Sequence, residues 1–162
     1  QAVLPIMRKE GRGRIINLSS LVGRFAFPLN GPYCATKHAV EALSEALYYE
    51  VRGFGIHVSV IQPGMFLTEF QSRSLRVHPD TDNPVSPYAA VREGTRRRRA
   101  KQAEAAGDPR EVAEAIWRAA TEANPRFRYR VGADAEEYLS LRDSLTDEQF
   151  FAEMEARHAP RH

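Results

Sequence analysis

The sequence predicts an α/β fold in which helices cover a parallel sheet, and three observations support this. Residues 14–18 are a short apolar, β-branched run, typical of a buried strand. Residues 33–52 carry apolar side chains at helical spacing, and residues 56–61 form a second β-branched run. A strand, a helix and a strand in this order form a crossover, which joins parallel strands.

Each of these elements has recognisable ends. Residues 2–9 resemble the last turns of a helix, and Gly11 follows them as a stop. Pro32 suits the first turn of the central helix because it has no amide hydrogen to lose there. Gly53 ends that helix, and the sequence 62–64 (QPG) breaks the second strand.

The second half of the chain begins with a segment that resists regular structure. Residues 65–90 contain several prolines and aspartates, and segments of this kind are often functional lids. We therefore predict that residues 65–107 form a substrate lid. The remaining elements expected from spacing and caps are helices at 87–106, 108–123, 134–142 and 147–156, and a strand at 127–131.

Composition predicts a single domain over residues 1–162. The 162 residues are 43% hydrophobic and 27% charged, which suits one compact core. The formal charge of +2 gives no electrostatic reason to expect a nucleic-acid partner. The four arginines at 96–99 are the only hint of a polyanion site, and a solvated helix face is the favoured interpretation.

Cysteine usage and hydropathy indicate a cytoplasmic protein. The single cysteine, Cys34, makes no internal disulfide, and the five histidines form no cluster at metal-ligand spacing. No stretch approaches the ~20 apolar residues that a membrane span requires. We therefore expect neither a metal site nor a membrane span.

The chemistry-bearing residues gather around the start of the central helix. Tyr33 and Lys37 are four residues apart, so both side chains lie on one helix face. A neighbouring ammonium favours the phenolate, which predicts that Lys37 lowers the pKa of Tyr33 toward that of a working acid or base. Ser20 lies thirteen residues earlier, at the carboxyl end of the first strand, where parallel sheets bind their ligands.

These residues suit proton transfer to or from an oxygen. A neutral hydroxyl at Ser20 can hydrogen-bond a carbonyl or alkoxide, while Tyr33 exchanges the proton. Taken alone, a tyrosine and a lysine at this spacing also occur by chance in amphipathic helices, and residues 19–20 also suit a simple turn.

Three spaced motifs settle the interpretation by resemblance. Residues 13–23 (GRIINLSSLVG), 33–37 (YCATK) and 60–64 (VIQPG), followed by Thr68, resemble the short-chain dehydrogenase/reductase family along the whole chain. The sequence around Tyr33 is similar to that of hydroxysteroid and retinol dehydrogenases within that family. The resemblance implies a Rossmann-like, doubly wound parallel sheet and an NAD or NADP cofactor.

The resemblance also implies roles for individual residues. Ser20, Tyr33 and Lys37 match the family's catalytic residues, and Tyr33 and Lys37 match its ribose contacts as well. The segment expected to line the nicotinamide matches Pro63, Gly64, Met65 and Thr68. A Pro-Gly turn lets backbone approach a flat ring, and a threonine hydroxyl can bind a carboxamide. Thr68 as a mere helix cap is the alternative.

The family's glycine-rich phosphate turn, and the residue that reads the ribose 2′ position, are expected before Gln1. The fold is thus predicted to be incomplete at its nucleotide-binding half, and the chain alone is expected to be inactive without that half.

The predicted function is hydride transfer between a nicotinamide and an apolar secondary alcohol or ketone. Two alternatives remain: a non-catalytic, dimerising piece or pseudoenzyme, and an epimerase or dehydratase of a related branch. The resemblance implies homo-oligomers, for which Tyr48 and Tyr49 would suit a helix interface.

Overall fold

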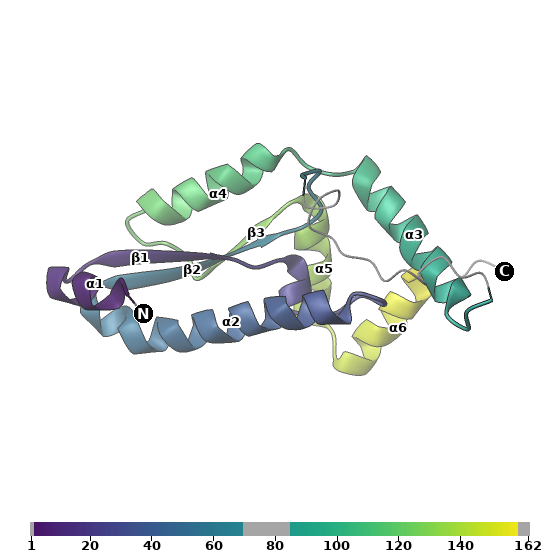
Figure 1. Cartoon of the computed structure of the whole chain (residues 1–162), viewed down its shortest axis with the longest axis horizontal. Helices are drawn as coiled ribbons and strands as arrows, with labels where there is room; N and C mark the ends of the chain where they lie inside the picture. Colours follow the sequence, from purple (N-terminus) through teal and green to yellow (C-terminus); the bar gives the residue numbers. More distant parts are fainter. Residues whose placement is uncertain (1, 70–84, 159–162) are drawn as a thin grey trace.

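The sheet has three parallel strands in the order β1-β2-β3 (Figure 1). The structure, a computed structural model, describes residues 2–69 and 85–158. The strands are β1 (Gly13–Leu18), β2 (Ile56–Pro63) and β3 (Arg128–Val131). The predicted α/β fold with a parallel sheet is confirmed.

The helices lie on both faces of this sheet, as in a doubly wound fold: α4 covers one face and α2 the other (Figure 1). None of the helices in the described ranges is both long and apolar enough to cross a bilayer. The helices are α1 (Leu4–Glu10), α2 (Gly31–Val51), α3 (Ala89–Glu104), α4 (Pro109–Thr121), α5 (Ala133–Ser144) and α6 (Asp147–His158), with two short 3-10 turns, η1 (Leu21–Gly23) and η2 (Arg52–Phe54).

Strand β2 runs to Pro63, past its predicted end at residue 61 and into the break predicted at residues 62–64. Peptide groups of a parallel strand alternate between its two neighbours, and Pro63 faces β1, on the same side as Ile61. The pairing of β1 with β2 ends at Leu18, so no residue of β1 lies opposite Pro63. The sheet therefore loses no hydrogen bond because proline lacks an amide hydrogen. The other neighbour still pairs, with the amide of Gly64 donating to the carbonyl of Val131 at 2.9 Å.

Helix α2 buries only some of its apolar positions, and it buries two polar ones as well. Its buried residues are Cys34, Glu41, Ser44 and Val51, while Leu43 is 71% exposed. Several alanines at helical spacing are exposed as well: Ala35, Ala39, Ala42 and Ala46. The helix therefore contacts the sheet through polar groups at Glu41 and Ser44 and through apolar groups near Val51, and it leaves an apolar stripe uncovered within the described structure.

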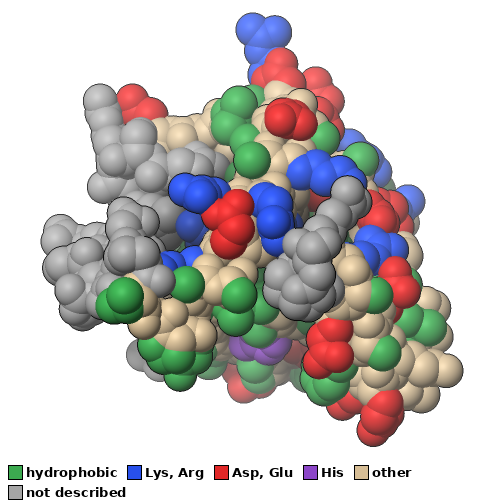
Figure 2. All heavy atoms as spheres, turned by 90° about the vertical axis from the view of Figure 1, so that its right-hand side faces the viewer, with side chains coloured by type: hydrophobic (Ala, Val, Ile, Leu, Met, Phe, Trp, Pro, Cys, Tyr) green, Lys and Arg blue, Asp and Glu red, His purple; other side chains and the backbone are tan. Residues whose placement is uncertain are grey.

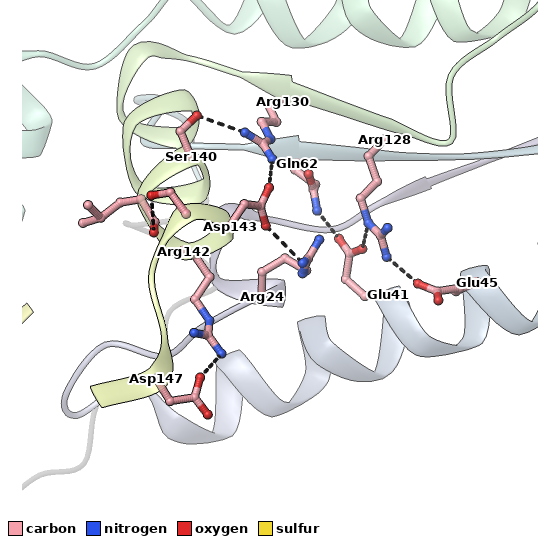
Figure 3. A network of polar contacts seen from close by, with 12 residues as sticks. Arg24, Glu41, Glu45, Gln62, Arg128, Arg130, Ser140, Arg142, Asp143 and Asp147 are labelled. Carbon is pink, nitrogen blue, oxygen red and sulfur yellow. Dashed lines mark hydrogen bonds and ion pairs between the residues drawn. The ribbon is translucent and has the colours of Figure 1, made fainter. Parts of the chain in front are cut away.

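A polar network holds the middle of α2 to the sheet (Figure 3). Glu41 accepts hydrogen bonds from Gln62 of β2 at 2.9 Å and from Arg128 of β3 at 2.9 Å. The same guanidinium reaches Glu45 at 2.7 Å. Because Glu41 is only 4% exposed, these bonds compensate the cost of burying its charge.

Beyond the carboxyl ends of the strands, aromatic side chains join η1, α5 and α6 into one core. The Phe25 ring lies edge-on to Phe27 at 5.0 Å and to Phe150 at 5.4 Å, measured between centroids. Tyr138 completes the cluster at 5.7 Å from Phe25. This packing fixes the loop between β1 and α2, which carries Ser20 at one end.

The predicted lid at residues 65–107 is described only in part. Residues 70–84 lie outside the described residues, and α3 occupies most of the remainder. The next helix, α4, begins at Pro109, and the side chain of its N-cap residue Asp108 forms a capping box with Glu111. The lid and the single-domain boundary both stay predictions.

Candidate active site

A cavity of about 560 Å³ lies at the carboxyl ends of β1 and β2. Its walls come from the η1 region, the first turns of α2, the segment after β2, and helices α3 and α4. All the residues predicted from the sequence for catalysis or cofactor binding line this one cavity: Ser20, Tyr33, Lys37, Pro63, Gly64, Met65 and Thr68.

Ser20 is held by the turn that follows β1. It caps η1 in an extended conformation, and its hydroxyl accepts a hydrogen bond from the Val22 amide at 3.4 Å. The same hydroxyl donates at 3.4 Å to the carbonyl of Pro63, the residue of β2 that faces β1. Both bonds are long, so the hydroxyl retains capacity to bind another oxygen.

Gly23 lets this turn approach helix α2. A Cβ at this position would lie 2.5 Å from the Ser19 hydroxyl oxygen and 3.2 Å from the Lys37 carbonyl oxygen. Any side chain here would push η1 away from α2. The contact is what brings Ser20 to the face of α2 that carries Tyr33.

Tyr33 is half-buried, and its side chain forms a hydrogen bond with Ser20. Burial raises the pKa of the phenol above its ordinary value, and the Ser20 hydrogen bond only partly opposes this. The predicted lowering of the Tyr33 pKa by Lys37 is therefore wrong for this structure. The cost of burying a phenolate sets the direction of the pKa shift, although the Lys37 ammonium lies 5.7 Å from the ring centroid.

Lys37 points its ammonium group at the end of β1. It donates to the Leu18 carbonyl at 3.0 Å, and burial lowers its pKa. Helical spacing thus places Tyr33 and Lys37 on one face, as predicted, and the Leu18 carbonyl fixes the lysine at the rim of the same cavity. Hydroxyl and ammonium donors side by side suit the hydroxyl groups of a sugar.

Asp134 is a site residue that the sequence interpretation missed. Its carboxylate accepts hydrogen bonds from the Met65 amide at 2.9 Å and, at the start of α5, from the Ala135 amide at 2.9 Å. A Cβ on Gly64 would lie 1.7 Å from the same carboxylate. Asp134 therefore fixes the Pro63–Met65 segment, and Gly64 is required for its close approach. An acidic residue in the first turn of a helix was the available signal.

Thr68 is exposed and lies on the cavity wall. The residues that would show whether it caps a helix begin at 70 and lie outside the described residues. Both interpretations of Thr68 therefore stay open.

The four arginines at 96–99 do not form a uniformly solvated face, so that interpretation is wrong for Arg98. Its guanidinium stacks on the buried Phe27 ring at 3.8 Å and donates to Gln102 at 2.6 Å. Both Arg98 and Arg99 line the cavity. Arg96 is exposed and pairs with Glu93. The sequence could not distinguish the four arginines from one another, because the fold decides which of them contacts Phe27.

Comparison with known proteins gives one family. The sequence pattern of the family described as short chain dehydrogenase matches residues 1–77. An uncharacterized oxidoreductase of Schizosaccharomyces pombe is 34% identical over 152 residues, which cover 94% of this chain and 62% of that protein.

Solved structures give the same result. A short-chain dehydrogenase from Streptomyces avermitilis is 33% identical with a TM-score of 0.71, over 98% of this chain and 56% of that one. A gluconate 5-dehydrogenase from Burkholderia cenocepacia, in complex with NADP and tartrate, is 26% identical with a TM-score of 0.59, over 85% of this chain and 50% of that one. The chain thus spans between half and 62% of the length of these proteins.

Proposed function

Because the chain belongs to the short-chain dehydrogenase/reductase family, we propose that it is the catalytic part of an oxidoreductase that uses NAD or NADP and acts on a secondary alcohol or ketone. The observation that carries this proposal is that Ser20, Tyr33 and Lys37 line a single cavity at the carboxyl edge of the sheet. Its apolar walls, which include Leu21, Val22 and Phe66, favour an apolar substrate.

The residues of this cavity fit the nicotinamide end of the cofactor. Lys37 and Tyr33 offer donors for ribose hydroxyls, while Pro63 and Met65 offer an apolar wall for a flat ring. Thr68 supplies a hydroxyl for a carboxamide. When bound, the nicotinamide supplies the hydride acceptor in oxidation and the hydride donor in reduction. A relative of known structure binds NADP, which supports this cofactor class without choosing between NADP and NAD.

The protein's own groups handle the proton. In the reducing direction the Tyr33 hydroxyl donates its proton to the carbonyl oxygen, and in oxidation the Tyr33 oxygen accepts the proton of the alcohol. The Ser20 hydroxyl donates a hydrogen bond to the same substrate oxygen and so stabilises the charge that develops there. Burial raises the Tyr33 pKa, which favours the neutral phenol that donates the proton in the reducing direction. The cationic ring of an oxidised cofactor and the Lys37 ammonium would both favour the phenolate that oxidation needs.

The test is nicotinamide-linked absorbance change with a panel of secondary alcohols and ketones. It uses the 162-residue chain and the full translation product of its gene. Replacing Tyr33→Phe is expected to lower kcat/KM about 10²- to 10⁴-fold, the usual contribution of a positioned proton donor. Tyr49→Phe is the matched control, because Tyr49 is exposed on the same helix.

Tyr33→Phe retaining full turnover would refute the proposed role of this residue. Absence of nicotinamide-linked turnover in every form of the protein would leave the non-catalytic alternative. A product with an inverted centre or an eliminated water, without net change in the nicotinamide, would identify the epimerase or dehydratase alternative.

We also propose that the protein forms a homo-oligomer through α2. Its uncovered apolar stripe supports this, with Leu43 71% exposed and Tyr49 64% exposed. Tyr48 contributes less than expected, since its ring packs against Phe127 at 5.1 Å. Sedimentation velocity of Leu43→Glu tests the proposal, because a buried glutamate at an interface should shift the protein toward monomer.

A further inference from the structure

The charged groups of the cavity are all of one sign. Among the described residues that line it, Lys37, Arg98 and Arg99 are cationic, and no aspartate or glutamate is present. Lys37 lies at the end of β1, whereas the two arginines come from α3. The cavity therefore has a second cationic region, on an element separate from those that carry Ser20 and Tyr33.

Arg98 is the better defined of the two arginines. The centre of its guanidinium lies over the Phe27 ring, at 3.8 Å from the ring centroid, and within the described residues its side chain hydrogen-bonds to the neutral Gln102. Gln102 also donates to Asp134, the residue that holds the Pro63–Met65 segment, at 3.4 Å. Arg98 is therefore held in one orientation by groups that do not neutralise it.

Among the described residues, no carboxylate pairs with Arg98 or Arg99, although Glu155 lines an adjoining cavity that Arg98 also borders. Burial, followed by repulsion from Arg99, lowers the pKa of Arg98 to about 10. Both effects disfavour the guanidinium cation, and a negatively charged ligand beside it would favour it again.

Several other arginines of the described residues are paired with carboxylates. Figure 2, which faces the right-hand side of Figure 1, shows acidic side chains lying among the basic ones on the surface. Arg24 pairs with Asp143 at 3.3 Å, Arg96 with Glu93 at 2.5 Å and Arg157 with Glu137 at 2.5 Å. Arg98 differs in facing an apolar cavity rather than a surface carboxylate.

We propose that Arg98, assisted by Arg99, binds a carboxylate of the substrate, so that the substrate is an apolar hydroxy acid or oxo acid. The inference deepens the function proposed above and depends on it for the identity of the reacting group. A guanidinium held over a ring can present two parallel N–H donors, which match a carboxylate. The apolar walls between the α3 arginines and Ser20 accommodate the carbon chain.

The experiment measures binding, so that it does not depend on turnover. Isothermal titration calorimetry compares octanoate with octanamide, which has nearly the same shape and no charge. The protein is expected to bind octanoate about 10- to 100-fold more tightly, as a charged hydrogen bond in a partly buried site provides. Arg98→Met should abolish this preference, and Arg98→Lys should retain part of it because the charge remains.

Arg96→Met is the matched control, because it removes an exposed guanidinium from the same helix. It should leave the preference for octanoate intact. Equal affinity of the unmodified protein for acid and amide would overturn the proposal, even if Arg98→Met failed to fold. A preference that survives in folded Arg98→Met would overturn it as well.

A phosphate of the cofactor is the other source of negative charge. Titration with NADH and NADPH separates the two, since Arg98→Met should leave both affinities unchanged if the anion belongs to the substrate. Weaker binding of either nucleotide by this variant would assign Arg98 to the cofactor and overturn the proposal. Octanoate binding that depends on Arg98, without turnover of any hydroxy acid, would instead count against the proposed enzyme activity.

Discussion

The polar side chains of helix α2 have different partners in its first two turns and in its middle. Near the start, Tyr33 and Lys37 line the cavity, and Lys37 has a backbone carbonyl as its hydrogen-bond partner. In the middle, Glu41 and Glu45 share Arg128, and Glu41 also holds Gln62. Both regions lie against the same sheet, yet only the middle region neutralises its charges internally.

The difference separates positioning from chemistry. A network whose charges cancel contributes a fixed geometry and little reactivity. Groups that face a cavity keep donors and acceptors for a ligand, and burial shifts their pKa values. The middle of α2 thus anchors the helix so that its first turns can hold unbalanced groups in place. Variants of the two regions should therefore affect different measurements.

The largest expected effect is that of Lys37→Met on turnover. Loss of the ammonium should lower kcat/KM by about 10²-fold or more, since it removes both a sugar contact and a charge beside the phenol. The melting temperature should not fall, because burial already disfavours the charged form. Lys101→Met, on the exposed side of α3, is the control. A lower melting temperature with unchanged turnover would mean that Lys37 stabilises the fold, as the residues in the middle of the helix do, and would contradict the difference between the two regions.

The next effect is on stability. Glu41→Ala leaves buried Gln62 without its partner and takes one of two carboxylates from Arg128. We expect a loss of about 2 kcal/mol in the free energy of unfolding, below the usual value for a broken buried pair because Glu45 remains. Urea denaturation measures it. Glu45→Ala, at the exposed end of the same network, should cost under about 1 kcal/mol. Equal losses in the two variants would contradict this account.

Gly64→Ala tests how the segment after β2 is held. The added Cβ would meet the Asp134 carboxylate, so we expect about 1 to 2 kcal/mol of destabilisation from overpacking, together with reduced turnover. Combining it with Asp134→Ala should relieve the clash but not restore turnover, because the Met65 amide then loses its acceptor. Gly31→Ala, where no atom lies within 4 Å of the new Cβ, is the control. Strict additivity of the two changes would exclude the proposed contact.

The smallest effect concerns the pKa of Tyr33. Burial raises this pKa and the Ser20 hydrogen bond lowers it, so Ser20→Ala should raise it further. Carbon NMR of labelled tyrosine, assigned with Tyr33→Phe, follows the ionisation at alkaline pH. A lower pKa in Ser20→Ala would mean that the serine does not stabilise the phenolate.

The sequence by itself determined the parallel sheet, the helices and the candidate site. Apolar, β-branched runs, helical spacing and glycine stops are local signals. They identified β1, α2 and β2 before any packing was known. Spacing also put Tyr33 and Lys37 on one helix face. The family motifs added Ser20 and the Pro63–Met65 segment.

Only the tertiary structure decided how these groups are held and charged. Three contacts join residues far apart in the chain, so no local pattern encodes them. They are the approach of the Asp134 carboxylate to Gly64, the stacking of Arg98 on Phe27 and the pairing of Glu41 with Arg128. The direction of the Tyr33 pKa shift likewise depends on burial, which is its largest cause. Burial and distant contacts are properties of the folded chain, and they turn a recognisable motif into a cavity with unbalanced positive charge.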